Sequence, residues 1–207
     1  MDSFGYLFNR AKESPYLIIP GLLALFNGYW YKICFFICRK RVKIGSWFRV
    51  CGKLYIYGCG EVIIGDNCII DSKLFKSTAF FTRTPSAKII IGNNCGFNGT
   101  SIQAYQKVCI GDWCNIADAY IIDSKGHHVS ADRRFRPAES VPSEPVIIHN
   151  NVWISTKTVV MSGVEIGENS VIGAFSLVNK SIPENCQAMG IPAKVMKDIP
   201  ASDDLGS

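Results

Sequence analysis

The most regular feature of the chain is an aliphatic residue at every sixth position of its C-terminal half. One phase holds Ile148, Ile154, Val160, Ile166, Ile172 and Val178. The same phase recurs upstream at residues 44, 50 and 56, at 64 and 70, at 91 and 97, and at 110, 116 and 122. A period of six matches neither the turn of an α-helix nor the alternation of a simple amphipathic strand. It predicts a solenoid whose coils have three short flat faces, each hexad giving one strand and one corner.

The fifth position of each hexad is small or β-branched. It holds Val152, Thr158, Val164, Ser170 and Ser176 downstream, and Cys68, Cys95 and Cys114 upstream. Side chains of this size fit the narrow interior of a coil, so we interpret these cysteines as small apolar fillers. The nine cysteines include no C-x-x-C pair, which gives no support to a zinc-ribbon or thioredoxin site. We predict no metal site.

The hexads of the form Ile-Gly-x-x-Cys/Ser-x and the closing segment Gly190-Ile191-Pro192-Ala193-Lys194-Val195 resemble the hexapeptide-repeat acyltransferases. The likeness is to the galactoside and maltose acetyltransferases and the polysaccharide O-acetyltransferases, and it covers residues 42–199. It implies an all-β solenoid, a left-handed parallel β-helix. The left hand follows from the resemblance alone, because parallel crossovers are right-handed in about 98% of cases. The resemblance also implies acetyl-CoA as co-substrate and a homotrimer with active sites between subunits.

The six-residue period is lost between Ile122 and Ile148, and residues 123–147 are predicted to form a protruding loop. A long interruption of a repetitive scaffold is more often functional than accidental. Its stretch Gly126-His127-His128-Val129 corresponds to the Gly-His-Pro-Val of the resembling enzymes, which implies His127 as the general base. Histidine suits this role because its unperturbed pKa is about 6.5. His128 stands at the proline position, so the choice between the two imidazoles stays open.

The resemblance implies the remaining site residues. The segment Phe97-Asn98-Gly99-Thr100-Ser101-Ile102 resembles the family's Phe-Asn-x-Thr-Ile, whose asparagine positions the acceptor or the acyl group, so Asn98 is the second catalytic candidate. Backbone N–H groups near Thr156 and Ala174 correspond to those that bind acetyl-CoA, and such groups stabilise a developing oxyanion. The other positions that correspond to coenzyme A contacts are Asn179, Lys180, Lys194 and Lys197.

Residues 1–41 are predicted to form an apolar, helical N-terminal segment with a basic cluster, and residues 200–207 a short tail. The stretch from Tyr16 to Cys38 is long enough to span a membrane, but a lysine, an asparagine and a proline inside it weaken that interpretation. Two alternatives remain. A helix or helical hairpin covers the open end of the solenoid, or it lies on the anionic inner face of a membrane with Arg39-Lys40-Arg41 as an electrostatic anchor.

The composition is that of one globular unit. A chain of 207 residues, 48% of them hydrophobic and 19% charged, builds a full core and is not a disordered chain. The net charge of +5 suits an anionic ligand or a membrane face and is too small to indicate nucleic acid. No Walker or Rossmann glycine loop occurs. The first fifteen residues lack the pattern of a signal peptide, so we expect a cytoplasmic protein, with peripheral contact to the inner membrane face as one alternative.

The resemblance, with the histidine in the loop, implies an O-acetyltransferase that moves an acetyl group from acetyl-CoA to a carbohydrate hydroxyl by direct attack. We expect the acceptor to be a surface polysaccharide or its lipid-linked or nucleotide-linked precursor. N-acetylation of an amino sugar and acetylation of an antibiotic hydroxyl are alternatives, because the fold does not choose the acceptor. A non-catalytic β-helix scaffold is a further alternative, which the histidine in the interrupting loop disfavours.

Overall fold

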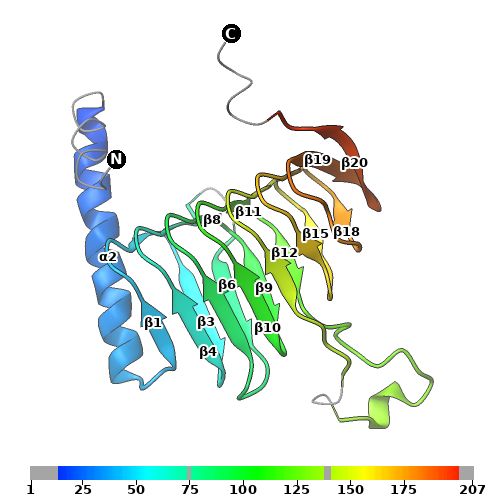
Figure 1. The fold of residues 1–207 in the computed structure, drawn as a ribbon. Coiled ribbons are helices and arrows are strands. Elements are labelled where there is room, and N and C mark those ends of the chain that lie inside the picture. The colour runs from blue at the N-terminus through cyan, green and yellow to red at the C-terminus, as the bar shows by residue number, and fades with distance from the viewer. Residues whose placement is uncertain (1–13, 74–75, 138–140, 201–207) are drawn as a thin grey trace.

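The structure is a computed structural model that describes residues 14–73, 76–137 and 141–200. Residues 1–13 of the predicted N-terminal segment, 138–140 of the predicted loop and 201–207 of the predicted tail lie outside the described residues. The fold is a parallel β-solenoid of about seven turns with one helix at its N-terminal end (Figure 1). The predicted solenoid is therefore confirmed.

Each of the first six turns gives one strand to each of three sheets, which we call A, B and C, and the last turn adds strands to sheet B alone. Sheet A contains β1 (Val42–Ile44), β4 (Glu61–Ile64), β7 (Lys88–Ile91), β10 (Lys107–Ile110), β13 (Val146–Ile148) and β16 (Glu165–Ile166). Sheet B contains β2 (Arg49–Cys51), β5 (Ile69–Asp71), β8 (Gly96–Asn98), β11 (Asn115–Ala117), β14 (Trp153–Ile154), β17 (Val171–Ile172), β19 (Cys186–Gly190) and β20 (Ala193–Asp198). Sheet C contains β3 (Leu54–Gly58), β6 (Thr78–Thr82), β9 (Ser101–Ala104), β12 (Tyr120–Ile122), β15 (Val159–Val160) and β18 (Leu177–Val178).

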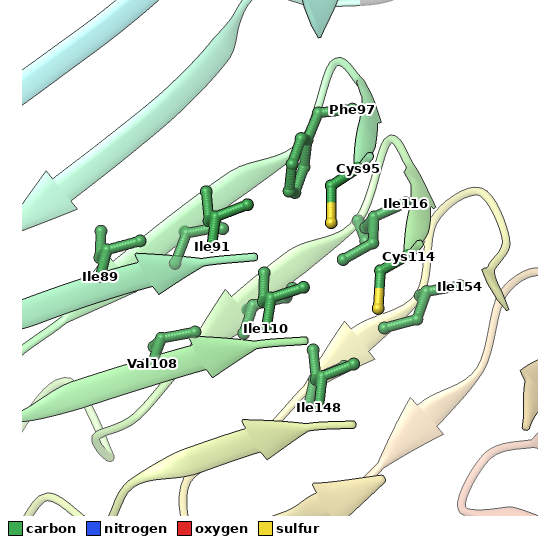
Figure 2. Close-up of a cluster of buried hydrophobic side chains, with 14 of the residues drawn as sticks. Ile89, Ile91, Cys95, Phe97, Val108, Ile110, Cys114, Ile116, Ile148 and Ile154 are labelled. Carbon is green, nitrogen blue, oxygen red and sulfur yellow. The ribbon is translucent and has the colours of Figure 1, made fainter. Parts of the chain in front are cut away.

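The in-phase aliphatic residues fill the interior of the coil, as predicted (Figure 2). The parallel register places Ile110 beside Ile148 and Ile148 beside Ile166, so equivalent positions of successive turns stack directly. From Ile148 to Val178 these residues are at most 1% exposed. The first turn is the exception, because Ile44 is only half-buried there.

Cysteines at the fifth hexad position point into the same interior. Cys68, Cys95 and Cys114 are buried, and Figure 2 shows the last two among the aliphatic side chains. Hydrogen bonding with the sulfurs of Cys114 and Cys68, together with burial, raises the pKa of the Cys95 thiol. The group therefore stays a neutral thiol at physiological pH, which agrees with its interpretation as a filler.

The corner between sheets A and B is built from stacked Asn and Asp side chains. Asp66 Oδ1 accepts a hydrogen bond from the N–H of Ser46 (2.6 Å), and Asn93 Oδ1 accepts one from the N–H of Asp66 (2.8 Å). Asp112 Oδ1 in turn accepts one from the N–H of Asn93 (2.6 Å). This ladder explains why polar residues recur at a fixed place in the hexads, since each satisfies a backbone donor of the preceding turn.

The N-terminal segment forms one α-helix, α2 (Ile18–Ile37), preceded by a short 3₁₀ turn at Pro15–Leu17. The helix covers the open end of the first turn, with Ala24 and Gly28 buried against it. A Cβ on Gly28 would lie 1.9 Å from the carbonyl oxygen of Phe48, so only glycine permits this approach. Of the two forms considered for the capping segment, the described residues from Tyr16 to Cys38 form a single helix and not a hairpin. Within the described ranges, no helix is both long and apolar enough to traverse a bilayer.

The C-terminal end departs from the hexad pattern. β20 runs antiparallel to β19, and the register shifts between Gln187 and Ala188. The resemblance extended the parallel β-helix to residue 199, whereas the last parallel strand ends at Gly190 and an antiparallel strand closes sheet B.

Candidate active site

The long loop leaves the solenoid at Asp123, directly after β12, and re-enters it at β13. β13 begins at Val146, so the loop ends two residues earlier than predicted. The Asp123 side chain is fully buried, and its carboxylate accepts hydrogen bonds from three consecutive backbone N–H groups of the preceding turn. The donors are Tyr105 (2.7 Å), Gln106 (2.7 Å) and Lys107 (2.6 Å). The start of the loop is therefore fixed to the solenoid by charge-assisted hydrogen bonds.

The end of the loop is fixed at the same place. The carbonyl oxygen of Asp123 accepts hydrogen bonds from the N–H of Glu144 (2.8 Å) and the hydroxyl of Ser162 (2.9 Å). Ser124 and Ser143 form an antiparallel bridge between the two arms. Sequence reasoning did not identify Asp123. The signal it missed is an acidic residue directly after two in-phase strand positions, where the repeat stops.

Beyond this stem, the loop projects away from the solenoid and contains a 3₁₀ turn at Arg133–Phe135 (Figure 1). Gly126 adopts a φ of +74°, a conformation that favours glycine, and the Ser124 hydroxyl accepts a hydrogen bond from its N–H (3.1 Å). This turn directly precedes the two candidate imidazoles. His127 is exposed and His128 is half-buried. The local geometry thus presents His127 to the solvent from an anchored stem.

Three of the predicted residues, Asn98, Thr156 and Ala174, lie one above another at the corner between sheets B and C. We call this row of corner residues the Asn98 column. Asn98 ends β8, and with its side-chain amide oriented to match its neighbours, the nitrogen donates to the carbonyl oxygen of Asp71 in the turn before (3.0 Å). In the next turn, the N–H of Asp118 donates to the carbonyl oxygen of Asn98 (2.5 Å). Thr156 follows, with its hydroxyl 3.4 Å from Asp118 Oδ2. The turn Ala174-Phe175 comes last, since the N–H of Phe175 donates to the carbonyl of Thr156 (2.9 Å).

Several backbone donors at this corner have no partner among the described residues, and those of two predicted residues are among them. The N–H groups of Thr156 and Ala174 have no hydrogen-bond partner in the described part of the chain, whereas their neighbours Ser155 and Gly173 donate to the following turn. Both residues are at least partly exposed. Unpaired N–H groups on the edge of a rigid coil are suitable donors for a carbonyl oxygen or an oxyanion.

Charged and aromatic side chains surround these donors. Lys157 forms an ion pair with Asp118, which sequence reasoning also missed. The sequence does contain a signal for this ion pair: an acidic residue at one corner is followed by a lysine at the equivalent corner of the next turn. Trp153 and Phe175 are 53% and 67% exposed, so neither ring packs into the core. The column is therefore bordered by apolar surface.

The other predicted residues lie elsewhere in the fold. Asn179 and Lys180 follow β18 at the corner between sheets C and A, the same corner from which the loop leaves. Lys194 and Lys197 lie on β20, opposite Met189 and Gln187 of β19. All four are exposed. The structure therefore unites Asn98, Thr156 and Ala174, and it separates them from the other predicted residues.

His127 and Asn98 lie at opposite edges of sheet C. Asn98 lies at the corner before β9, and the loop leaves at the corner after β12. A hexad of six residues spans at most about 20 Å, so the two corners of one chain are a full face apart. The third histidine, His149, lies away from both and contacts Glu165 (Nε2 to Oε1, 2.6 Å). No cluster of three or more metal-ligating side chains occurs in the described ranges.

Comparison with known proteins yields relatives in both sequence and structure. The family model for the bacterial transferase hexapeptide, six repeats, matches residues 145–180. The chain is 37% identical over 138 residues to galactoside O-acetyltransferase of Escherichia coli (strain K12), covering 66% of this chain and 63% of that protein. It is 36% identical over 145 residues to galactoside O-acetyltransferase of Lactococcus lactis, covering 68% and 64%. The matches thus span slightly less than two thirds of these relatives.

Two solved structures show similar folds. A galactoside acetyltransferase in complex with coenzyme A superposes with a TM-score of 0.58 at 25% identity, covering 92% of this chain and 84% of that one. A variant of the N-acyltransferase AntD from Bacillus cereus, in complex with an amino-deoxy sugar nucleotide and coenzyme A, gives a TM-score of 0.67 at 21% identity, covering 84% and 92%. The second likeness concerns the fold alone.

Proposed function

This chain is a hexapeptide-repeat protein, and on that premise we propose that it is an acetyl-CoA-dependent O-acetyltransferase acting on a carbohydrate hydroxyl. The observation that carries the proposal is the loop, which leaves the solenoid at a buried carboxylate and presents His127 to solvent. A scaffold has no need of such a loop. The kinship to galactoside O-acetyltransferases supports the transfer of an acetyl group to a sugar hydroxyl.

Each residue has a distinct role in the proposed reaction. His127 takes the proton of the acceptor hydroxyl as its oxygen attacks the thioester carbonyl, and the thiol of coenzyme A is the leaving group. Asn98 positions the acceptor or the acyl oxygen. The unpaired N–H groups of Thr156 and Ala174 hold the acetyl-CoA arm and the developing oxyanion. Asn179, Lys180, Lys194 and Lys197 contact coenzyme A.

The proposed site is completed between neighbouring copies in a homotrimer. Support comes from the separation of the candidate residues, because the loop and the Asn98 column lie on opposite edges of sheet C in one chain. When copies pack side by side, the loop of one can face the column of the next. Each interface then holds one complete site, and a closed ring of three holds three sites.

The proposed acceptor is a surface polysaccharide or its lipid-linked or nucleotide-linked precursor, modified in the cytoplasm. Support for that compartment comes from the cysteines, all nine of which are free thiols. Free thiols persist in the reducing environment in which acetyl-CoA is also available.

The function is tested by release of free thiol from acetyl-CoA in the presence of candidate acceptors. The panel contains galactosides, amino sugars, nucleotide sugars, a lipid-linked oligosaccharide and purified capsular polysaccharides. We expect acceptor-dependent thiol release with at least one hydroxyl acceptor. Release with amino sugars alone would assign N-acetylation instead. If coenzyme A does not bind and no acceptor supports release, the chain is a scaffold.

Replacing both Lys194 and Lys197 by alanine is expected to raise KM for acetyl-CoA about 10-fold while kcat changes little, because exposed lysines add equally to ground-state and transition-state binding. Steady-state kinetics at saturating acceptor measure both constants. The matched control removes two exposed lysines of sheet A, Lys88 and Lys107, and should leave KM unchanged. A fall in kcat at constant KM would contradict the assignment of these lysines to coenzyme A binding.

A further inference from the structure

The cap helix α2 has an outward face that no residue in the described ranges packs against. Nine of its large apolar residues are between 50% and 85% exposed: Ile19, Leu22, Leu23, Phe26, Tyr29, Trp30, Ile33, Phe36 and Ile37. We call them the outer face. At 100° per residue they occupy one stripe of about 140° around the helix, with Ala24 and Gly28 on the opposite side. Soluble proteins rarely expose a contiguous apolar surface of this kind unless it binds something.

Capping does not explain the outer face. The contacts that hold the cap come from the inner side, where Asn27 Nδ2 donates to the carbonyl of Val50 (3.3 Å) and the N–H of Leu54 donates to the Tyr31 hydroxyl (3.2 Å). With Ala24 and Gly28 these residues close the first turn. Polar residues on the opposite side would serve a cap equally well. The two alternatives drawn from the sequence, a cap and a membrane contact, therefore use different faces of one helix.

Charge indicates the kind of surface that fits the outer face. Residues 14–43 contain five cations, Lys32, Arg39, Lys40, Arg41 and Lys43, and no carboxylate. Arg39 and Lys40, both exposed, follow the helix after its C-cap residue, Cys38. A bilayer rich in anionic lipid offers an apolar layer beneath a negatively charged layer, which complements an apolar stripe next to a basic cluster. A second copy of α2 fits less well, because its residues 14–43 would place further cations, and no carboxylate, next to these cations.

A groove beside the C-terminal end of α2 joins the two features. It has a volume of about 490 Å³ and is lined by Phe35, Phe36, Val42 and Ile44 together with Lys32, Arg39 and Lys40. Phe36 belongs to the outer face, so apolar and cationic side chains share one continuous wall. An acyl chain on the apolar part would place its phosphate among the cations. Burial lowers the pKa of Lys32, whose Nζ donates to the carbonyl of Gly45 (2.5 Å), so Arg39 and Lys40 are the main partners for that phosphate.

We propose that the outer face of α2 docks on an anionic lipid bilayer, with Arg39 and Lys40 binding lipid phosphates. The inner side of the same helix closes the solenoid. The chain then sits on the membrane by one end, with the axis of the solenoid directed away from the bilayer. This proposal is independent of the acyl transfer proposed above, because it uses none of the residues assigned to that reaction.

Vesicle sedimentation with the full chain tests the proposal. We expect the protein to pellet with vesicles of phosphatidylcholine containing about one third phosphatidylglycerol, to bind phosphatidylcholine alone at least 10-fold more weakly, and to detach as salt is raised. Phe26→Gln with Phe36→Gln should weaken binding to both vesicles about 10-fold, through lost apolar contact. Arg39→Gln with Lys40→Gln should remove about 10-fold of the preference for anionic vesicles.

Matched controls separate docking from loss of folding or of charge. Val195→Gln with Met196→Gln removes exposed apolar side chains of β20, and Lys88→Gln with Lys107→Gln removes two exposed cations of sheet A. Both pairs should bind like the unmodified chain, and every variant should keep its melting temperature. Failure of the unmodified chain to pellet, or equal binding to both vesicles, overturns the proposal. So does a fall in oligomer mass in the outer-face variant without lipid, which would assign the face to a second copy.

Discussion

Replacing His127 by alanine is expected to lower kcat by about 10²–10⁴-fold, because a positioned general base contributes this much to proton transfer. His127 is exposed on a loop and contributes nothing to the core, so the variant should fold and bind acetyl-CoA as before. Thiol release from acetyl-CoA with a saturating acceptor gives kcat. Thermal unfolding and binding of coenzyme A show that the remainder of the protein is intact.

The other two histidines provide the controls for this experiment. His128→Ala removes the adjacent imidazole, and His149→Ala removes the one that contacts Glu165 on a distant corner. Both should retain activity within a few-fold of the unmodified protein. If only His128→Ala is inactive, the base lies one residue further along. Full activity of His127→Ala would remove the proposed mechanism.

Mixing two inactive variants tests whether the site is shared between subunits. His127→Ala keeps an intact Asn98 column, and Asn98→Ala keeps an intact loop. In randomly mixed oligomers with equal amounts of both, about one quarter of the shared sites would hold an intact loop facing an intact column, and activity should return to about that fraction. Homogeneous preparations of either variant should remain inactive. Absence of recovery after subunit exchange would place each site within one chain.

The hexad pattern was sufficient to predict the solenoid, because an aliphatic or small residue at a repeated position indicates that the position is buried. Ile148 and Ile166 stack across one turn, and Cys95, two turns before Ile148, is buried in the same interior, which its small size permits. The column at Asn98 also follows from the repeat, since residues at equivalent places in the hexads align along one corner. Periodicity thus contains the information for contacts between successive turns.

Other features depend on contacts that no period reveals. The three donors to Asp123 lie 16–18 residues before it in the sequence, and its burial follows from how the loop leaves the coil. The sequence shows α2 as generally apolar, and only packing against Phe48 distinguishes its inner side from its outer face. The reversal of β20 likewise lies outside the repeat. Outside the hexad repeat, tertiary contacts determine the structure, and the sequence pattern alone does not reveal them.

Asp123→Asn is expected to lower the free energy of unfolding by about 2–4 kcal/mol, because buried N–H groups lose a charged acceptor and one of them meets an amide N–H₂. For a chain of this size the melting temperature should fall by roughly 5–15 °C. The three donors are Tyr105, Gln106 and Lys107, so hydrogen exchange of these amides should accelerate. Because the same carboxylate fixes the loop that carries His127, kcat should fall as well.

Asp132→Asn is the matched control for this change. Its carboxylate lies on the same loop but is exposed, and it pairs with Arg136 (2.9 Å), so we expect the melting temperature to stay unchanged. Calorimetry and amide exchange are measured on both variants. A melting temperature and exchange rates of Asp123→Asn equal to those of the unmodified protein would show that the loop is held by its backbone contacts instead. If Asp123→Asn loses kcat while the amides of residues 105–107 stay protected, the carboxylate acts in the reaction itself and not through the stem.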